Sequence, residues 1–178
     1  MIFLYRGDSI DQLATRSNFL EVAYLLINGE LPTAGQLEQF DHSIRYHTMI
    51  NETLLRFFNG FHYDAHPMAM VSAVVSSMAA FYHDSMDNNN PRHREIFAHR
   101  ILAKIPTVSA AAFKHMLGQP FVYPRNDLDY CANMLNMFFA VPAEDYVVDP
   151  MAAEALDLLL MLHADHEQNA STSTVRLA

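Results

Sequence analysis

Two histidines and a run of polar residues near the end of the chain form the group best suited to chemistry. His163 and His166 are three residues apart, so they lie on one face if this segment is helical. They are followed by polar residues almost without interruption: Glu167, Gln168, Asn169, Ser171, Thr172, Ser173 and Thr174. Such a cluster is costly to bury without hydrogen-bond partners, and behind an apolar helix it indicates the lining of a cleft. A solvated helix end, whose histidines complement the helix dipole, fits the same pattern.

The same segment could in principle bind a metal ion, because it holds two histidines and two carboxylates within residues 163–167. Their order differs from the His-Glu-x-x-His order of zinc proteases, and no distant third ligand stands out. We therefore expect no metal site in this chain.

Four basic residues form a second group, which lies in the middle of an otherwise acidic chain. Arg92 and Arg94 follow Asn90-Pro91, and Arg100 and Lys104 come a few helical turns later. A cluster of this kind can bind phosphate or carboxylate groups. Ion pairs with the surplus of Asp and Glu would explain it equally well.

Helices must position both groups, because apolar residues recur at helical spacing between eight punctuating prolines. Ser17-Asn18 is suited to begin one helix, and Gly29 lies just past its end. A second begins at Thr33 and includes His47, and it continues or restarts through Phe58. Further helices are predicted over residues 67–83, 91–102, 106–118, 127–140 and 149–165. A short strand near residues 2–5 is the only β-structure we expect, so the fold class is all-α.

Composition limits the function classes. With 178 residues, 51% hydrophobic and 17% charged, the chain has the balance of one globular domain. Its net charge of −9 argues against general nucleic-acid binding. A single cysteine, Cys131, excludes an intrachain disulfide and favours a reducing, cytoplasmic location. The longest uncharged run, residues 65–82, is short for a membrane span, so we expect no membrane partner.

Motifs spread along the whole chain resemble citrate synthase, in particular the bacterial class that also forms hexamers. They include Arg6-Gly7, Ile10-Asp11-Gln12-Leu13-Ala14, Leu26-Ile27-Asn28-Gly29-Glu30, His47-Thr48-Met49-Ile50, His66-Pro67-Met68, and the segments 81–85, 89–95, 118–128 and 163–176. Long motifs in the same order make the resemblance specific. It implies that residues 1–178 are part of a large domain of antiparallel helices, which works as a homodimer or a hexamer. It also implies that the small domain and the later catalytic parts are absent from a chain that is a fragment.

The resemblance assigns roles to the histidine segment. The family condenses acetyl-CoA with oxaloacetate and water to give citrate and CoA, which is the entry to the tricarboxylic acid cycle. By resemblance, His166 binds oxaloacetate with His163 beside it, and Asn169 and Ser171 support a later catalytic histidine. That histidine lies in a Gly-Pro-x-His-Gly-Gly segment, which this chain does not contain, and a catalytic aspartate comes later still. We therefore expect no catalytic acid or base in the chain and no citrate formation by the isolated polypeptide.

The resemblance also implies an allosteric NADH site, the one cofactor-like ligand that we expect. His47, Tyr82, Arg100 and Lys104 stand at positions that resemble it. Two departures are Tyr46, where a basic residue is expected, and Ala143, where a reactive cysteine often lies.

Two alternatives remain open at this point. The first is a 2-methylcitrate synthase, although the polar run after His166 looks more like the citrate enzymes. The second is a non-catalytic helical assembly module, whose apolar faces would serve as interfaces.

Overall fold

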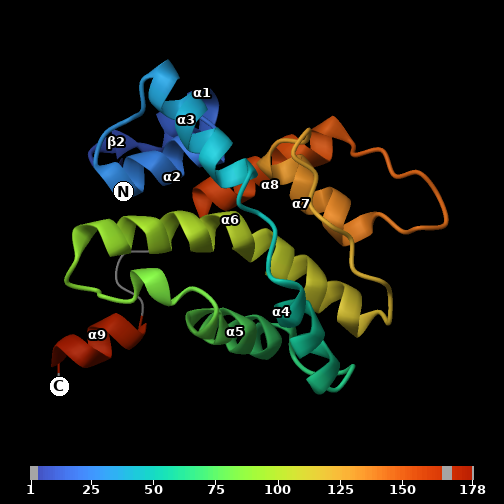
Figure 1. Cartoon of the computed structure of the whole chain (residues 1–178). Helices are drawn as coiled ribbons and strands as arrows, with labels where there is room; N and C mark the ends of the chain where they lie inside the picture. Colours follow the sequence, from blue (N-terminus) through green and yellow to red (C-terminus); the bar gives the residue numbers. More distant parts are fainter. Residues whose placement is uncertain (1–3, 166–169, 178) are drawn as a thin grey trace. The chain divides into compact units, whose positions relative to one another are not determined.

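The computed structural model describes residues 4–165 and 170–177, and it confirms the all-α fold class (Figure 1). Strands β1 (Leu4–Tyr5) and β2 (Asp8–Ser9) form one short antiparallel pair, with Leu4 opposite Ser9. Arg6 and Gly7 make the turn between them with φ of 53° and 105°, a region that glycine adopts without strain. No helix among the described residues is long and apolar enough to cross a membrane.

The chain folds as two compact units, which are described separately. Unit 1 combines residues 1–37 with residues 154–178, and unit 2 comprises residues 38–153. The boundaries fall within two helices, α3 (Ala34–Arg45) and α8 (Pro150–Leu162). The prediction that residues 1–178 form one part of a large domain is not tested by this division and stays a prediction.

Unit 1 has a small core formed by Tyr5, Leu13, Val22, Leu25 and Met161. Its complete helices are α1 (Ile10–Arg16), α2 (Phe19–Asn28) and α9 (Ala170–Leu177). The predicted ends of α2 are confirmed: Asn18 and Glu21 form a reciprocal capping box, and Gly29 ends the helix with φ of 93°. Neither α1 nor the helix α9, which lies within the polar run, was expected from the sequence.

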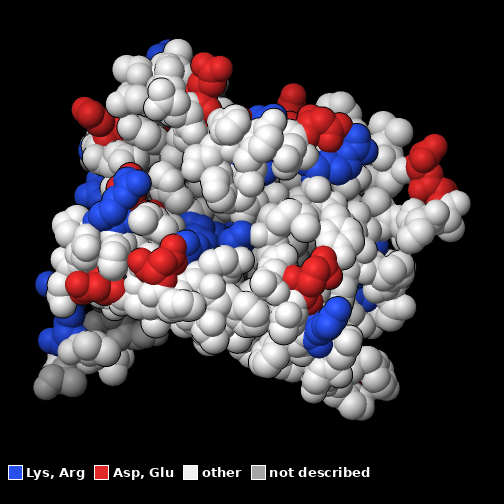
Figure 2. All heavy atoms as spheres, viewed as in Figure 1, with Lys and Arg blue, Asp and Glu red and all other residues white. Residues whose placement is uncertain are grey.

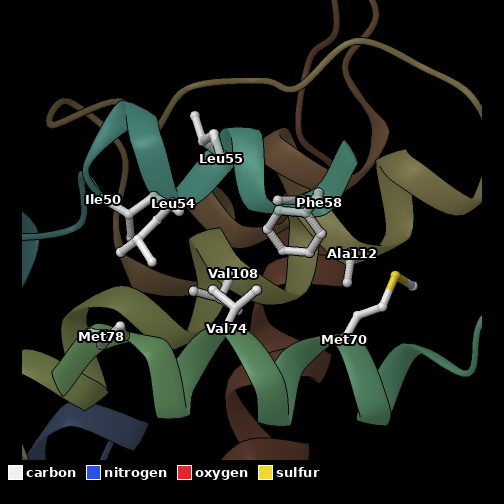
Figure 3. Packing of buried hydrophobic residues seen from close by; sticks show 10 residues of the cluster. Ile50, Leu54, Leu55, Phe58, Met70, Val74, Met78, Val108 and Ala112 are labelled. Carbon is white, nitrogen blue, oxygen red and sulfur yellow. The ribbon is translucent and has the colours of Figure 1, made fainter. Parts of the chain in front are cut away.

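Unit 2 is built around α6 (Pro91–Met116), against which α5 (Pro67–Ser77) and α7 (Tyr130–Phe139) pack. The remaining elements are α4 (Glu52–Phe57) and three short 3₁₀ turns, η1 (Phe58–Gly60), η2 (Met78–Ala80) and η3 (His83–Ser85). In Figure 3, side chains of α4 and η1 point toward α5 and α6, and Phe58 lies fully buried among them. Close packing of these apolar side chains fixes the position of α6, which carries the basic group.

Helix α6 corrects one prediction, because residues 91–102 and 106–118 form a single helix that continues through Pro106. Proline has no backbone N–H, so the carbonyl of Leu102, four residues earlier, loses its helical partner. The hydroxyl of Tyr130 on α7 donates to this carbonyl at 2.9 Å. The bond lost at Pro106 is thus replaced by a side chain from another helix, which the sequence pattern could not indicate.

Two other helices end earlier than predicted. α3 ends at Arg45, so His47 lies just beyond the helix, and α4 is a separate helix. The His47 ring donates through Nδ1 to the carbonyl of Ser43 at 2.6 Å, the carbonyl that its own N–H would bind if the helix continued. α5 ends at Ser77 rather than near residue 83. At this end, the Ser77 hydroxyl donates to the carbonyl of Val74.

Candidate functional site

A pocket of about 360 Å³ in unit 2 brings together all four residues that resemble an allosteric NADH site. Its lining consists of Ser43, His47, Tyr82, Arg92, Glu95, Ile96, His99, Arg100 and Lys104. Six of these belong to one face of α6, where residues 92, 95, 96, 99, 100 and 104 follow the helical repeat. The other three come from segments far away in the sequence. Figure 2 shows basic and acidic side chains next to one another on the face of the molecule where α6 begins.

Tyr82 lies between η2 and η3, where its ring contacts Arg100 and Lys104 of α6. The ring centroid lies 4.6 Å from the Arg100 guanidinium carbon and 5.3 Å from Lys104 Nζ. These are the distances of cation–π contacts. Burial raises the pKa of the Tyr82 hydroxyl, although the positive charge of Arg100 opposes this effect. Tyr82 is therefore a neutral, aromatic wall of the pocket.

Lys104 positions another part of the pocket lining, because its ammonium group binds the backbone that follows α3. Nζ donates to the carbonyl of His47 at 2.7 Å and also to the carbonyl of Met49. One turn later, the Thr107 hydroxyl donates to the carbonyl of Thr48 at 2.8 Å. Three successive carbonyls are thus bound by side chains of α6. Burial lowers the pKa of Lys104 to about 8, and the nearby charge of Arg100 adds to this effect.

Arg100 links α6 to η3. Its guanidinium donates to both carboxylate oxygens of Asp84, at 3.1 and 3.3 Å, and to the Ser85 hydroxyl at 2.7 Å. The hydrogen bond from Arg100 lowers the pKa of Asp84 below its usual value. Most of the Arg100 side chain is buried, whereas Asp84 is largely exposed, so an incoming anion could compete with Asp84 for the guanidinium.

Several residues of this pocket were not expected from the sequence, and the titratable ones among them are His99 and Glu95. A signal was available: Arg92, Glu95, His99 and Arg100 recur at the three- and four-residue spacing of one helical face. His99 is half-buried, and its ring packs edge-on against Phe40 with centroids 5.0 Å apart. Burial lowers the pKa of His99.

The remaining basic residues are engaged outside the pocket or with local partners. Arg92 pairs with Glu95 at 3.2 Å, and Arg94 donates to the carbonyl of Asn88. The two departures from the family pattern, Tyr46 and Ala143, are both exposed, and neither lines the pocket. Tyr46 instead stacks on His42, with ring centroids 4.2 Å apart.

The histidine segment is described only in part. His163 is exposed and donates through Nδ1 to the carbonyl of Leu159 at 2.7 Å, one helical turn earlier. Ser171 belongs to α9, and His166 and Asn169 lie outside the described residues. Whether these four side chains come together is therefore not tested, and their roles stay predictions. Within residues 4–165 and 170–177, no three His, Cys, Asp or Glu residues are grouped as metal ligands would be.

The end of α8 that leads into this segment is fastened within unit 1. The Tyr5 hydroxyl lies 3.2 Å from the carbonyls of Met161 and Leu162. The Asp157 carboxylate accepts a bond of 2.9 Å from the backbone N–H of Phe19, at the beginning of α2. An acceptor at that position satisfies an N–H that has no partner within the helix and complements the helix dipole.

Comparisons with known proteins agree with this fold. The family model described as citrate synthase, C-terminal domain, matches residues 1–178. The crystal structure of citrate synthase from Pyrobaculum aerophilum superposes with a TM-score of 0.83 at 32% identity, covering 96% of this chain and 43% of that chain. The citrate synthase from Thermotoga maritima MSB8 gives a TM-score of 0.77 at 25% identity, covering 96% and 42%.

The chain belongs to the citrate synthase family. It spans less than half the length of the two citrate synthases with which it was superposed.

Proposed function

We propose that this chain is part of a cytoplasmic citrate synthase, an acyltransferase that condenses acetyl-CoA with oxaloacetate and water to give citrate and CoA. The observation that carries the proposal is the match of the entire chain to one family, including the segment 163–176. The condensation needs an acid and a base to enolise acetyl-CoA at its methyl group and a polarised carbonyl on oxaloacetate. In this proposal the chain supplies only part of the second requirement, the polarised carbonyl.

His166 is the residue to which we assign the main oxaloacetate contact, with His163 beside it and Asn169 and Ser171 as supporting residues. An imidazole N–H directed at the ketone oxygen would stabilise the negative charge that develops when the enol attacks. The acid and base themselves come from parts of the enzyme outside residues 1–178. We therefore expect no citrate formation by this polypeptide alone.

The test is a thiol-release assay on the enzyme that contains this segment and on the purified 178-residue chain. We expect turnover only from the enzyme, and a loss of about 10²–10³-fold in kcat for His166→Ala, the effect of removing one donor to a developing oxyanion. His62→Gln, an exposed histidine in unit 2, serves as the matched control. Steady turnover by the isolated chain would contradict the proposal.

The substrate assignment has a direct competitor, 2-methylcitrate synthase. Comparing acetyl-CoA with propionyl-CoA separates the two, because the acyl chain differs by one methylene and a pocket discriminates this difference by about 10–200-fold. Preference for propionyl-CoA would replace citrate by 2-methylcitrate as the product. No turnover with either thioester, together with a stable large assembly in light scattering, would favour the helical assembly module.

We further propose that the enzyme belongs to the hexameric class and that the α6 pocket binds NADH as an allosteric effector. The supporting observation is that His47, Tyr82, Arg100 and Lys104 line one pocket of about 360 Å³, with cations above an aromatic ring. An adenine or nicotinamide ring could stack on Tyr82, and the diphosphate could pair with the arginines.

A fluorescence titration of the enzyme with NADH tests this site. We expect saturable binding that is weakened at least tenfold by Arg100→Ala, because a bidentate, largely buried cation is removed. The control is Arg94→Ala on the same helix, since Arg94 does not line the pocket. The hexamer is tested separately by the mass of the assembly in light scattering, and a dimer would exclude the hexameric class.

A further inference from the structure

His99 is the pocket residue to which neither the family resemblance nor the proposed function gives a role. It is half-buried, lies among the other lining residues of the pocket, and packs edge-on against Phe40. Among the described residues, no hydrogen bond is formed by its ring, so no fixed donor or acceptor sets its protonation state. Histidine changes its charge near physiological pH, so the surrounding charges can decide which form is present.

The charges around His99 determine whether its imidazole is neutral or protonated before a ligand binds. Arg92, Arg100 and Lys104 on α6 and His47 after α3 line the same pocket, as do Tyr82 and one carboxylate, Glu95. Burial is the main cause that lowers the pKa of His99, and the charge of Glu95 opposes it. Arg92 and His47 lower it further. In the empty pocket, therefore, the neutral imidazole is favoured.

A ligand that carries phosphate groups would raise the pKa of His99 and favour its protonated form. Negative charge within a few ångströms favours the imidazolium and offsets the repulsion from the neighbouring cations. The neutral ring becomes charged as the ligand enters, and the free energy of protonation and that of binding are coupled reciprocally.

We propose that His99 makes binding in the α6 pocket proton-linked, so that a proton is taken up at its ring when a phosphate-bearing ligand binds. This inference rests on the proposed nucleotide site in the same pocket. Binding is then tightest at low pH and weakens as the pH rises through the pKa that His99 has in the complex. A regulatory site of this kind would respond to the acidity of its surroundings as well as to the concentration of its ligand.

Isothermal titration calorimetry of the enzyme with NADH measures the linked proton directly. The binding enthalpy is recorded in two buffers with different ionisation enthalpies, and its slope gives the number of protons taken up. At pH 6.5 Lys104 is already protonated in the free pocket, because its pKa of about 8 lies well above this pH. Uptake at pH 6.5 thus reports on histidine, and we expect affinity to fall about tenfold between pH 6.5 and 8.

Two substitutions of His99 and one control complete the experiment. His99→Gln should abolish most of the uptake at pH 6.5, whereas His99→Lys should retain tight binding to higher pH without uptake. His115→Gln is the control, because His115 lies on the same helix about 24 Å further along its axis and outside the pocket. Circular dichroism confirms that each variant is folded before it is titrated.

The outcomes distinguish the role of His99 from the presence of a nucleotide site in the α6 pocket. Proton uptake that is lost in His99→Gln and kept in His115→Gln supports both. NADH binding with no uptake by the unmodified enzyme, or with uptake unchanged in His99→Gln, overturns the role of His99 and leaves the nucleotide pocket standing. Absence of NADH binding at any pH overturns the pocket assignment and the inference with it.

Discussion

Lys104 in unit 2 and Tyr5 in unit 1 perform the same structural task with different chemical groups. Each side chain binds two backbone carbonyls that lie far away in the sequence. Lys104 holds the segment that forms one wall of the α6 pocket, and Tyr5 holds the last turn of α8, directly before His163. Both candidate regions are therefore positioned by a side chain that replaces regular backbone hydrogen bonding.

The difference lies in what each group can do besides holding the backbone. An ammonium group has three N–H bonds and can donate to two carbonyls separately, whereas a hydroxyl has one hydrogen to share between two acceptors at 3.2 Å. The ammonium also carries a charge, whose burial lowers its pKa to about 8. The pocket wall thus depends on a group that responds to pH and to nearby anions, which suits a regulatory site.

The largest expected effect comes from removing the ammonium. Lys104→Met keeps the length of the side chain but leaves two carbonyls without their donor, so we expect the free energy of unfolding to fall by about 2–4 kcal/mol. Urea denaturation followed by circular dichroism measures this loss. Arg94→Met, an exposed position on the same helix, should change stability by less than about 0.5 kcal/mol. A Lys104→Met variant as stable as this control would remove the basis of the comparison.

A smaller effect is expected from a third carbonyl-binding side chain, Tyr130. Tyr130→Phe removes the hydroxyl that donates to the Leu102 carbonyl and should cost about 1–2 kcal/mol. In a chain that also carries Pro106→Ala, the backbone N–H can bind the same carbonyl, and the cost of Tyr130→Phe should fall below about 0.5 kcal/mol. Equal costs in both backgrounds, measured by the double-mutant cycle, would show that the hydroxyl does not replace the bond lost at proline.

Tyr5→Phe should cost less again, about 0.5–1 kcal/mol, because the two acceptors share a single hydrogen. In the enzyme, we also expect a several-fold rise in the KM for oxaloacetate with little change in the affinity for NADH. Lys104→Met should weaken the affinity for NADH and leave the KM for oxaloacetate nearly unchanged. Equal effects of Tyr5→Phe on both ligands would contradict the assignment of the two regions to separate tasks.

The smallest expected effect is the pH dependence of stability that Lys104 contributes. Its charged form is disfavoured in the folded state, so the penalty is fully present below about pH 8 and is relieved between pH 8 and the ordinary lysine value of 10.5. Within this range the unfolded chain binds more protons, and stability rises with pH. The difference in stability between the unmodified chain and Lys104→Met should widen from pH 7 to pH 9, by less than about 1 kcal/mol because the group is partly screened by solvent. A constant difference would contradict the lowered pKa.

Features governed by neighbouring residues could be predicted from the sequence. Asn18, Glu21 and Gly29 determine both ends of α2 through local bonds and a positive φ, and Asn90 with Pro91 begins α6 as expected. The end of α3 could not be foreseen, because the ring of His47 replaces its own backbone N–H. The continuation of α6 through Pro106 could not be foreseen either, because the hydroxyl that binds the Leu102 carbonyl comes from Tyr130, 28 residues further along the chain.

For the candidate sites, the sequence indicated which residues take part but not which partners they bind. The family pattern indicated His47, Tyr82, Arg100 and Lys104, and the structure places them around one pocket. It could not indicate that Lys104 binds backbone carbonyls more than 50 residues away, or that Arg100 is already paired with Asp84. Such partners depend on tertiary packing, which neither spacing nor residue type encodes by itself.

The proline within α6 also bears on how this part of the molecule would assemble. Without Tyr130, the Leu102 carbonyl has neither a backbone donor nor a side-chain donor. We therefore expect the two halves of α6 to form first as local helices and to join into one continuous helix when α7 packs against them.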